Sequence, residues 1–463
     1  MDAGGGTPRL LHFVRVSADE AQFSDRPPDT THTCLGEVSV GGRASVAPAP
    51  AVDRVVLWSP PGHFIGSHDK SYGAADTASS SGRATTGATH GSARHRPLFK
   101  SAIQKCTRRQ MPDAAARFAR ALADAGGVND LLRRAVVILV EDAIVSPRLP
   151  LLVWFMAAAA KGFALDDADL DLIADCMGQA AALTVRDCVP PVEPDPQHGA
   201  CLGASGNHPI VDALLLRVCY GGTPGDMRML ARAASLWQAR LTGPTPALWT
   251  ESLVQLFSMD MAKVTHNGPC SDDGDGAVCA TAHGDGKGAK TKDAHEGASL
   301  VASVPVEAAD FHCFPRMCAE VAAAVLGRFT PEAIREAVWH HRSSLNFKRP
   351  WTDPRDPLAP PSPQGLVGVP DDRVDMTAVL RTARCWTAIA GHVDLIARRN
   401  IERVASTIVT IPTEAPTAVR TGQKRSRATA QIDKRPLDRA QPKTTRQCLI
   451  RSFLAAPPTP RPL

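Results

Sequence analysis

One segment of this chain is almost purely apolar. Residues Leu149–Ala160 form an uncharged run between Arg148 and Lys161. As a helix this run spans about 18 Å, well short of the roughly 30 Å hydrocarbon core of a bilayer. A helix that is apolar on all sides has to be surrounded by other elements. The run therefore predicts a buried central helix rather than a membrane span.

Helical patterns occupy most of the chain around this run. In a helical domain at 97–264 we expect helices at Pro97–Arg109, Asp113–Ala125, Leu131–Ile144, Leu149–Lys161, Asp166–Asp187, 208–220, 226–240 and 248–263. Short connections between them favour antiparallel packing. Residues 300–410 continue the body with helices at Phe311–Leu326, Pro331–Arg342 and Asp375–Arg403, interrupted by a Pro-rich loop at 348–371.

The remaining segments differ in composition. Residues 1–58 form a small N-terminal segment in which β-branched residues favour short strands at Leu10–Val16 and Val52–Trp58. Residues 59–96 and 265–299 are rich in Gly, Ser and polar residues, so they bury too little apolar surface to fold. We therefore expect a mainly α protein: a helical bundle body with disordered linkers and a disordered basic tail at 411–463.

The charge of the chain is divided unevenly. The total is 52 basic and 47 acidic residues, a net charge of +5. Residues 411–463 contain 11 of the basic and 3 of the acidic residues, a net of +8, which leaves −3 for the rest. A basic tail of this kind stays extended and attracts phosphate or an acidic partner.

The cysteines and the N-terminus indicate a reducing compartment. The 12 Cys are scattered without a pair of CxxC motifs, and the first residues lack the apolar stretch of a secretory signal. We expect free thiols and a protein that is neither secreted nor membrane-bound, located in the nucleus or in a viral replication compartment.

Two groups of residues have side chains that bind metals. The first comprises Cys313, Cys318, His340 and His341, and the second comprises Cys270, Cys279, His266, His283 and His295 beside Asp272, Asp273 and Asp275. The spacing between Cys313 and Cys318 is wider than in a usual zinc knuckle, and adjacent histidines point about 100° apart on a helix. We therefore expect no metal and no cofactor, with the first group as the zinc ligands to test.

Basic residues next to tryptophan form a third candidate. Arg342, Lys348 and Arg349 lie between Trp339 and Trp351. Arginine and lysine beside aromatic rings suit a nucleic-acid surface. The alternative, which we favour, is a solvated basic loop beside a core tryptophan.

The tail contains the most informative residues. Its basic residues include Lys424, Arg425, Arg427, Lys434, Arg435, Lys443 and Arg446. The strings QKRSR and DKRP are typical of a bipartite nuclear-localisation signal or of an arm that contacts nucleic acid. A tail that only improves solubility is the alternative.

A short motif follows this basic segment. Gln447, Ile450, Phe453 and Leu454 have the spacing of Gln, aliphatic, first aromatic and second aromatic residues. The segment 447–454 resembles the sliding-clamp (PCNA) interacting peptide, with Leu454 in place of the usual second aromatic. One helical turn brings Ile450 and Phe453 to the same face, which suits a hydrophobic pocket. The resemblance implies a sliding clamp as partner.

The first helices carry a second resemblance. The matching residues are Lys100–Ser101, Asp113–Ala115, Leu122, Arg133–Arg134, Ile138, Glu141–Asp142 and Leu149–Leu151. They resemble the helical collar of clamp-loader-like AAA+ ATPases related to the Werner-helicase-interacting protein. The resemblance covers 97–162. The ATPase module is missing: the nearest string to a phosphate-binding loop, Gly82–Thr89, has Ala88 where lysine is required.

Together these features predict a non-enzymatic accessory or scaffold protein of DNA replication or repair that binds a sliding clamp, with DNA as a second partner. We expect no ATP hydrolysis. Two alternatives remain open. One is a nucleic-acid-processing enzyme whose active site the sequence does not reveal. The other is a nuclear protein-interaction scaffold that does not bind a clamp.

Limited proteolysis tests the domain organisation. We expect the first cuts within 59–96, 265–299 and 412–446, because these stretches lack apolar periodicity. Mass spectrometry of the early fragments locates the cuts. Protection of all three stretches would contradict the proposed organisation.

Overall fold

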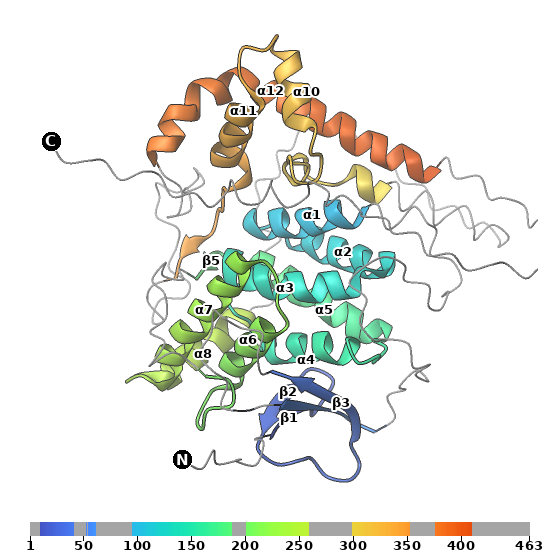
Figure 1. The fold of residues 1–463 in the computed structure, drawn as a ribbon, viewed down its shortest axis with the longest axis vertical. Coiled ribbons are helices and arrows are strands. Elements are labelled where there is room, and N and C mark those ends of the chain that lie inside the picture. The colour runs from blue at the N-terminus through green and yellow to red at the C-terminus, as the bar shows by residue number, and fades with distance from the viewer. Residues whose placement is uncertain are drawn as a thin grey trace, which may run out of the picture. The chain divides into compact units, whose positions relative to one another are not determined.

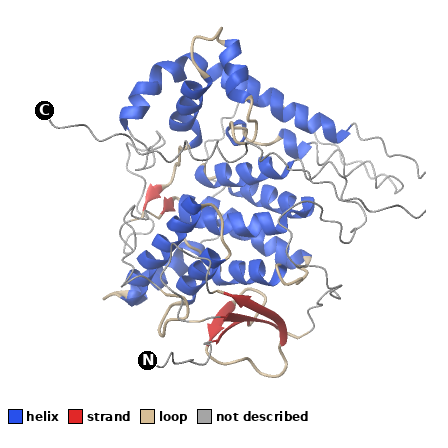
Figure 2. Cartoon of the chain, in the orientation of Figure 1, coloured by secondary structure: helices blue, strands red, loops and turns tan. Residues whose placement is uncertain are grey.

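The computed structural model describes residues 10–40, 52, 54–61, 95–187, 201–258, 299–351 and 376–409. Of these residues 63% are helical, which confirms the mainly α fold (Figures 1 and 2). The stretches expected to be disordered lie outside the described residues, apart from a few residues at their edges.

The described helices follow the expected order. They are α1 (Arg96–Arg108), α2 (Pro112–Leu122), α3 (Val128–Asp142), α4 (Leu149–Ala159), α5 (Asp167–Ala182), α6 (Pro209–Cys219), α7 (Pro224–Thr242), α8 (Pro246–Ser258), α10 (Met317–Ala324), α11 (Pro331–Val338) and α12 (Met376–Val409). Short helical turns are η2 (Ala123–Gly127), η4 (Val306–Ala308) and η5 (Trp339–Ser343). None of the described helices is long and apolar enough to cross a membrane.

The apolar run forms the centre of the core, as expected. Every residue of α4 from Leu149 to Ala158 is buried. A four-stranded sheet packs on one side of α4, and α3 and α6 pack on its other sides. Burying an all-apolar helix between these layers removes a large apolar area from water, which stabilises the fold.

The N-terminal sheet contains two strands that the sequence did not reveal. β1 (Leu10–Arg15) and β4 (Arg54–Ser59) are the expected strands, and they pair in parallel, with Phe13 opposite Leu57. β2 (Ala21–Ser24) and β3 (Thr33–Ser39) pair antiparallel at the two edges, in the order β2-β1-β4-β3. Both edge strands are short or half-exposed, so their apolar signal is weak.

One expected helix begins later than predicted. The pattern predicted a helix over Phe311–Leu326, but α10 begins at Met317. The Asp310 carboxylate accepts a hydrogen bond from the backbone N–H of His312 at 2.8 Å, and the Asp310 carbonyl accepts one from Phe314 at 3.0 Å. This local turn competes with the first helical turn.

A buried arginine joins the sheet to the helices. Arg15 at the end of β1 donates from Nη2 to Oδ1 of Asp169 in α5 at 2.7 Å, and both side chains are about 4% exposed. Its guanidinium also lies over the rings of Phe155 and Trp154, 4.9 and 5.7 Å from their centroids. A charge buried in this way depends on its partners, because a single unpaired ion in the interior is costly.

Substituting Arg15 tests this junction. We expect Arg15→Met to lower the free energy of unfolding by about 3–5 kcal/mol, because Asp169 is left as an uncompensated buried charge. Arg54→Met is the matched control: Arg54 pairs with Glu37 on the surface, where both side chains are more than 40% exposed, and its loss should cost less than about 1 kcal/mol. Urea denaturation measures both, and equal effects would contradict the assigned role.

Candidate functional site

One buried segment contacts the ends of three helices. Residues 342–351, called the strap below, run from η5 to a short strand β6 (Arg349–Pro350). The strap lies against the C-terminal ends of α1, α3 and α5, whose last carbonyl groups have no partner within their own helices. Figure 1 shows β6 beside β5 (Val185–Arg186).

At α1 and α3, the strap contacts a cluster of charged side chains. Arg108 donates from Nε to Asp142 Oδ1 at 2.5 Å and from Nη1 to the Ser343 carbonyl at 2.7 Å. Lys105 Nζ donates to the same carbonyl at 2.5 Å and lies 4.0 Å from Asp310. In return, Asn346 Nδ2 donates to the Asp142 carbonyl at 3.2 Å. The cluster therefore fixes the strap to the ends of both helices.

At α5, the strap provides a C-cap from far along the chain. Nζ of Lys348 donates to the carbonyls of Ala180 at 2.8 Å and Ala181 at 3.0 Å, and also to the carbonyl of Leu183. Three acceptors match the three donors of an ammonium group. A cation is also favoured at this end of a helix by the helix dipole.

The strap ends in a cluster of tryptophans. Trp351 lies 6.2 Å from Trp237 and 5.0 Å from Trp249, measured between ring centroids. The guanidinium of Arg240 lies 4.3 Å from the Trp249 ring centroid and pairs with Asp187 at 2.8 Å. Because Asp187 follows β5 directly, this cluster holds the parallel pairing of β5 and β6 in place.

Burial changes the proton affinity of both lysines. The pKa of Lys348 falls from its usual 10.5 to about 7, because the ammonium is removed from water. The pKa of Lys105 also falls to about 7, mainly through burial and then through the charge of Arg108, although Asp310 and Asp142 oppose this shift. Both groups therefore titrate close to neutral pH while facing carbonyl oxygens.

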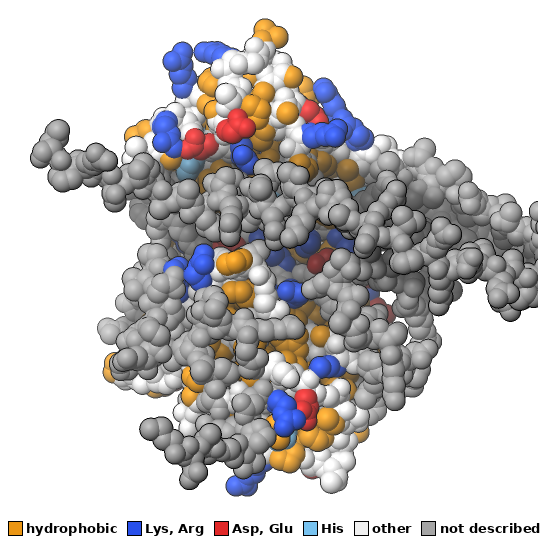
Figure 3. All heavy atoms as spheres, viewed as in Figure 1, with side chains coloured by type: hydrophobic (Ala, Val, Ile, Leu, Met, Phe, Trp, Pro, Cys, Tyr) orange, Lys and Arg blue, Asp and Glu red, His pale blue; other side chains and the backbone are white. Residues whose placement is uncertain are grey.

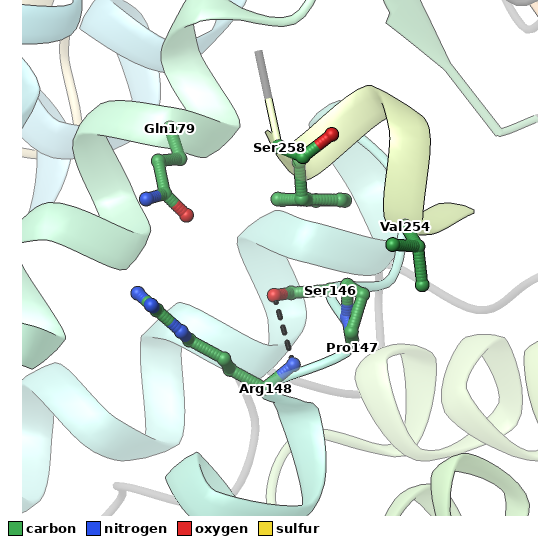
Figure 4. Close-up of a pocket in the computed structure, with 7 residues that line it drawn as sticks. Ser146, Pro147, Arg148, Gln179, Val254 and Ser258 are labelled. Carbon is green, nitrogen blue, oxygen red and sulfur yellow. Dashed lines mark hydrogen bonds between the residues drawn. The ribbon is translucent and has the colours of Figure 1, made fainter. Parts of the chain in front are cut away.

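A small pocket lies at the start of α4, next to α5 and α8. Its volume is about 200 Å³, and it is lined by Ser146, Pro147, Arg148, Gln179, Val254, Phe257 and Ser258 (Figure 4). The pocket is smaller than typical sites for organic ligands, which occupy about 300–1,000 Å³. Lys105 and Lys348 are not among its lining residues.

The four zinc candidates do not form a metal site in the part of the chain that the structure describes. Cys313 Sγ lies 3.5 Å from the Pro97 carbonyl, and burial raises the pKa of this thiol to about 12, which disfavours the thiolate that zinc requires. Cys318 is buried in α10. His341 Nε2 lies 3.0 Å from the Thr382 hydroxyl, and its ring stacks on Trp386. Within the described ranges, no three His, Cys, Asp or Glu residues are grouped to hold a metal.

The nucleic-acid surface considered around Trp339 and Trp351 is wrong for three of its residues, whereas Trp339 itself is 41% exposed. Arg342 and Lys348 are 4% and 1% exposed, and Trp351 is 1% exposed. Arg342 is held by Asp394 at 2.6 Å and by the Val306 carbonyl. The favoured alternative, a solvated loop, is also wrong for these cations, because helix ends and carboxylates bind them inside the protein; only the core position of Trp351 is confirmed.

Other candidates lie outside the described residues. They are the tail residues from Lys424 to Leu454, the second Cys and His group at 266–295, and the string at 82–89. The binding roles given to them therefore stay predictions.

Sequence reasoning missed the residues that hold the strap. The sequence pattern places Lys105, Arg108 and Asp142 on the polar side of amphipathic helices. It places Asn346 in a loop. The sequence contains one weak signal for the strap. Its polar residues lie between Trp339 and Trp351, whereas an exposed loop does not need tryptophans at its ends.

Comparison of the chain with protein-family models, with curated proteins and with solved structures finds no match.

The buried lysines predict a specific pH dependence. Between pH 7 and about 10, unfolded Lys348 keeps the proton that the folded form gives up, so the free energy of unfolding rises with pH. Lys348→Met should reduce this slope by up to about 1.4 kcal/mol per pH unit. Urea denaturation at several values between pH 7 and 8.5 measures it. Ionisation of the cysteines of the unfolded chain contributes equally to both proteins and cancels in the comparison.

Two further variants make this test decisive. Lys105→Met should reduce the slope in the same way, because the pKa of Lys105 is also about 7. Lys100→Met is the control, since the Lys100 side chain is 34% exposed and lies 3.6 Å from Asp130 on the surface. An unchanged slope in both buried-lysine variants would mean that neither residue titrates in this range.

Proposed function

We propose that this protein is a non-enzymatic accessory protein of DNA replication or repair, which binds a sliding clamp through its C-terminal tail. One observation carries the proposal: Gln447, Ile450, Phe453 and Leu454 occur at the spacing of a clamp-interacting peptide, directly after a strongly basic segment. Basic residues near such a motif steer it toward an acidic protein surface or toward DNA.

The described body supports a non-enzymatic role in one respect. Lys105 and Lys348 titrate near neutral pH, as catalytic lysines often do, but their Nζ atoms face backbone carbonyls. Charged groups that satisfy helix ends in this way serve the fold. The body therefore acts as a scaffold, and the tail provides the recognition motif.

A nuclear interaction scaffold that does not bind a clamp is the second candidate. One observation favours it: α12 exposes Leu380 and Leu395, which are 73% and 56% accessible to solvent. Large apolar residues on the outside of a helix are typical of contact surfaces when basic residues surround them.

Peptide binding tests the clamp proposal. We expect a peptide of residues 440–460 to bind a eukaryotic or viral sliding clamp, and Ile450→Ala with Phe453→Ala to weaken binding about 30- to 1,000-fold. Fully burying each side chain contributes about 1.5–3 kcal/mol, so truncating both removes about 2–4 kcal/mol, at 1.4 kcal/mol per tenfold change. Fluorescence anisotropy measures the affinities.

Three further peptides sharpen this experiment. Leu454→Phe should tighten binding, because a larger ring fills the second aromatic position. Replacing Lys443 and Arg446 by glutamine should slow association at low salt and have little effect at high salt. Thr444→Ala with Thr445→Ala is the control outside the motif. If the double-alanine peptide binds as tightly as the native peptide, the clamp proposal fails and the scaffold candidate remains.

A further inference from the structure

The outer face of α12 is exposed along most of this 34-residue helix. Its inner face, which includes Ile389, Val393 and Ile396, is buried in the core, where α12 packs against α10 and α11. Leu395 and Leu380 point the other way, with exposed fractions of 56% and 73%. In Figure 3 the part formed by α10–α12, at the top, exposes hydrophobic and basic side chains side by side.

The helical spacing places four residues of the outer face of α12 on one stripe. Arg384, Gly391, Leu395 and Arg399 are separated by 7, 4 and 4 positions. At 100° per residue their directions fall within an arc of about 80°, and at 1.5 Å per residue the stripe is about 22 Å long. This is the length of four turns of a partner helix.

The stripe has a positive charge. Arg384, Arg398 and Arg399 are exposed and make no ion pair within the described part of the chain, whereas the carboxylate of Asp394 is taken up by Arg342 at 2.6 Å. Between Arg384 and Ser406 of α12, Glu402 is the one other exposed carboxylate. A partner of opposite charge is therefore favoured, and a second copy of this helix is repelled.

Gly391 leaves the backbone bare in the middle of the stripe. A Cβ atom at this position would meet no neighbouring heavy atom within 4 Å, and its φ is not positive. Packing within the described structure therefore does not require glycine here, although glycine lowers helix stability. A bare backbone beside an exposed leucine allows another helix to approach closely.

We propose that this stripe binds an acidic amphipathic helix of a partner protein. Leucines of the partner helix cover Leu395 and the bare backbone at Gly391, and its carboxylates pair with Arg384, Arg398 and Arg399. The basic tail of this chain, with its net charge of +8, is disfavoured as occupant because it has the same charge. The proposal is independent of clamp binding by the tail.

The test uses the full chain and two synthetic helical peptides. Both have 18 residues with leucines at positions i, i+4 and i+7, and their remaining positions are glutamate and alanine in one and lysine and alanine in the other. We expect the acidic peptide to bind in the range of about 10–100 μM at 50 mM salt, and the basic peptide not to bind at 200 μM. Isothermal titration calorimetry measures both.

Variants separate an interface from a structural role. Leu395→Ser should weaken binding about fivefold or more, and Arg398→Gln with Arg399→Gln should weaken it at 50 mM but not at 500 mM salt. Gly391→Gln should also weaken it while leaving the Tm unchanged or higher, because glutamine is the better helix former. Val254→Ser on α8 is the matched control, since Val254 is 54% exposed.

Two results would overturn the proposal. One is absence of binding of the acidic peptide at 200 μM, or binding that is the same in Leu395→Ser and in the native chain. The other is preferential binding of a 20-base-pair DNA duplex that depends on Arg398 and Arg399 but not on Leu395, which would make the stripe a phosphate-binding surface.

Discussion

Three helices of this protein end at one place, and the carbonyl groups at their ends need hydrogen-bond donors. α1, α3 and α5 all present their C-terminal ends to the strap at 342–351. The strap supplies these donors: Lys348 for α5, the Asn346 amide for α3 and the Phe347 backbone N–H for α1. In return, Lys105 and Arg108 of α1 donate to the Ser343 carbonyl of the strap. The end of the strap then continues into the tryptophan cluster around Trp351. The connection between the first and last helices of the body depends on this exchange.

Placing cations inside the protein has a cost as well as a benefit. Removing an ammonium or guanidinium group from water costs several kcal/mol unless good acceptors replace the water. For Lys348 the acceptors are carbonyls at the end of α5, which are themselves short of donors and carry partial negative charge. The hydration that the cation loses and the donors that the helix end lacks therefore compensate for each other. An apolar side chain in place of Lys348 would leave three carbonyls unpaired, so the lysine specifies where the strap must lie.

The same residue types serve different purposes in different parts of the chain. In the strap, Arg342 and Lys348 are buried and paired inside the protein. On the outer face of α12 and throughout 411–463, basic side chains are exposed or lie in a sequence too polar to bury them. The contacts with other macromolecules that we propose therefore lie on the last helix and on the tail.

The sequence by itself determined the helices, because apolar periodicity and capping signals act within a few residues. The run at Leu149–Ala160 correctly predicted the central helix, and Gly126, with φ of +71°, makes the break between α2 and α3 where the Gly pair predicted it. The edge strands β2 and β3 were missed, since their stability comes from pairing with β1 and β4. The start of α10 was misplaced because a turn at Asp310 replaces the first helical turn. The tertiary structure alone decided the role of the basic residues near Trp351. Lys348 has its acceptors at Ala180 and Ala181, more than 160 positions away, and no local pattern can show whether a lysine faces water or the end of a helix.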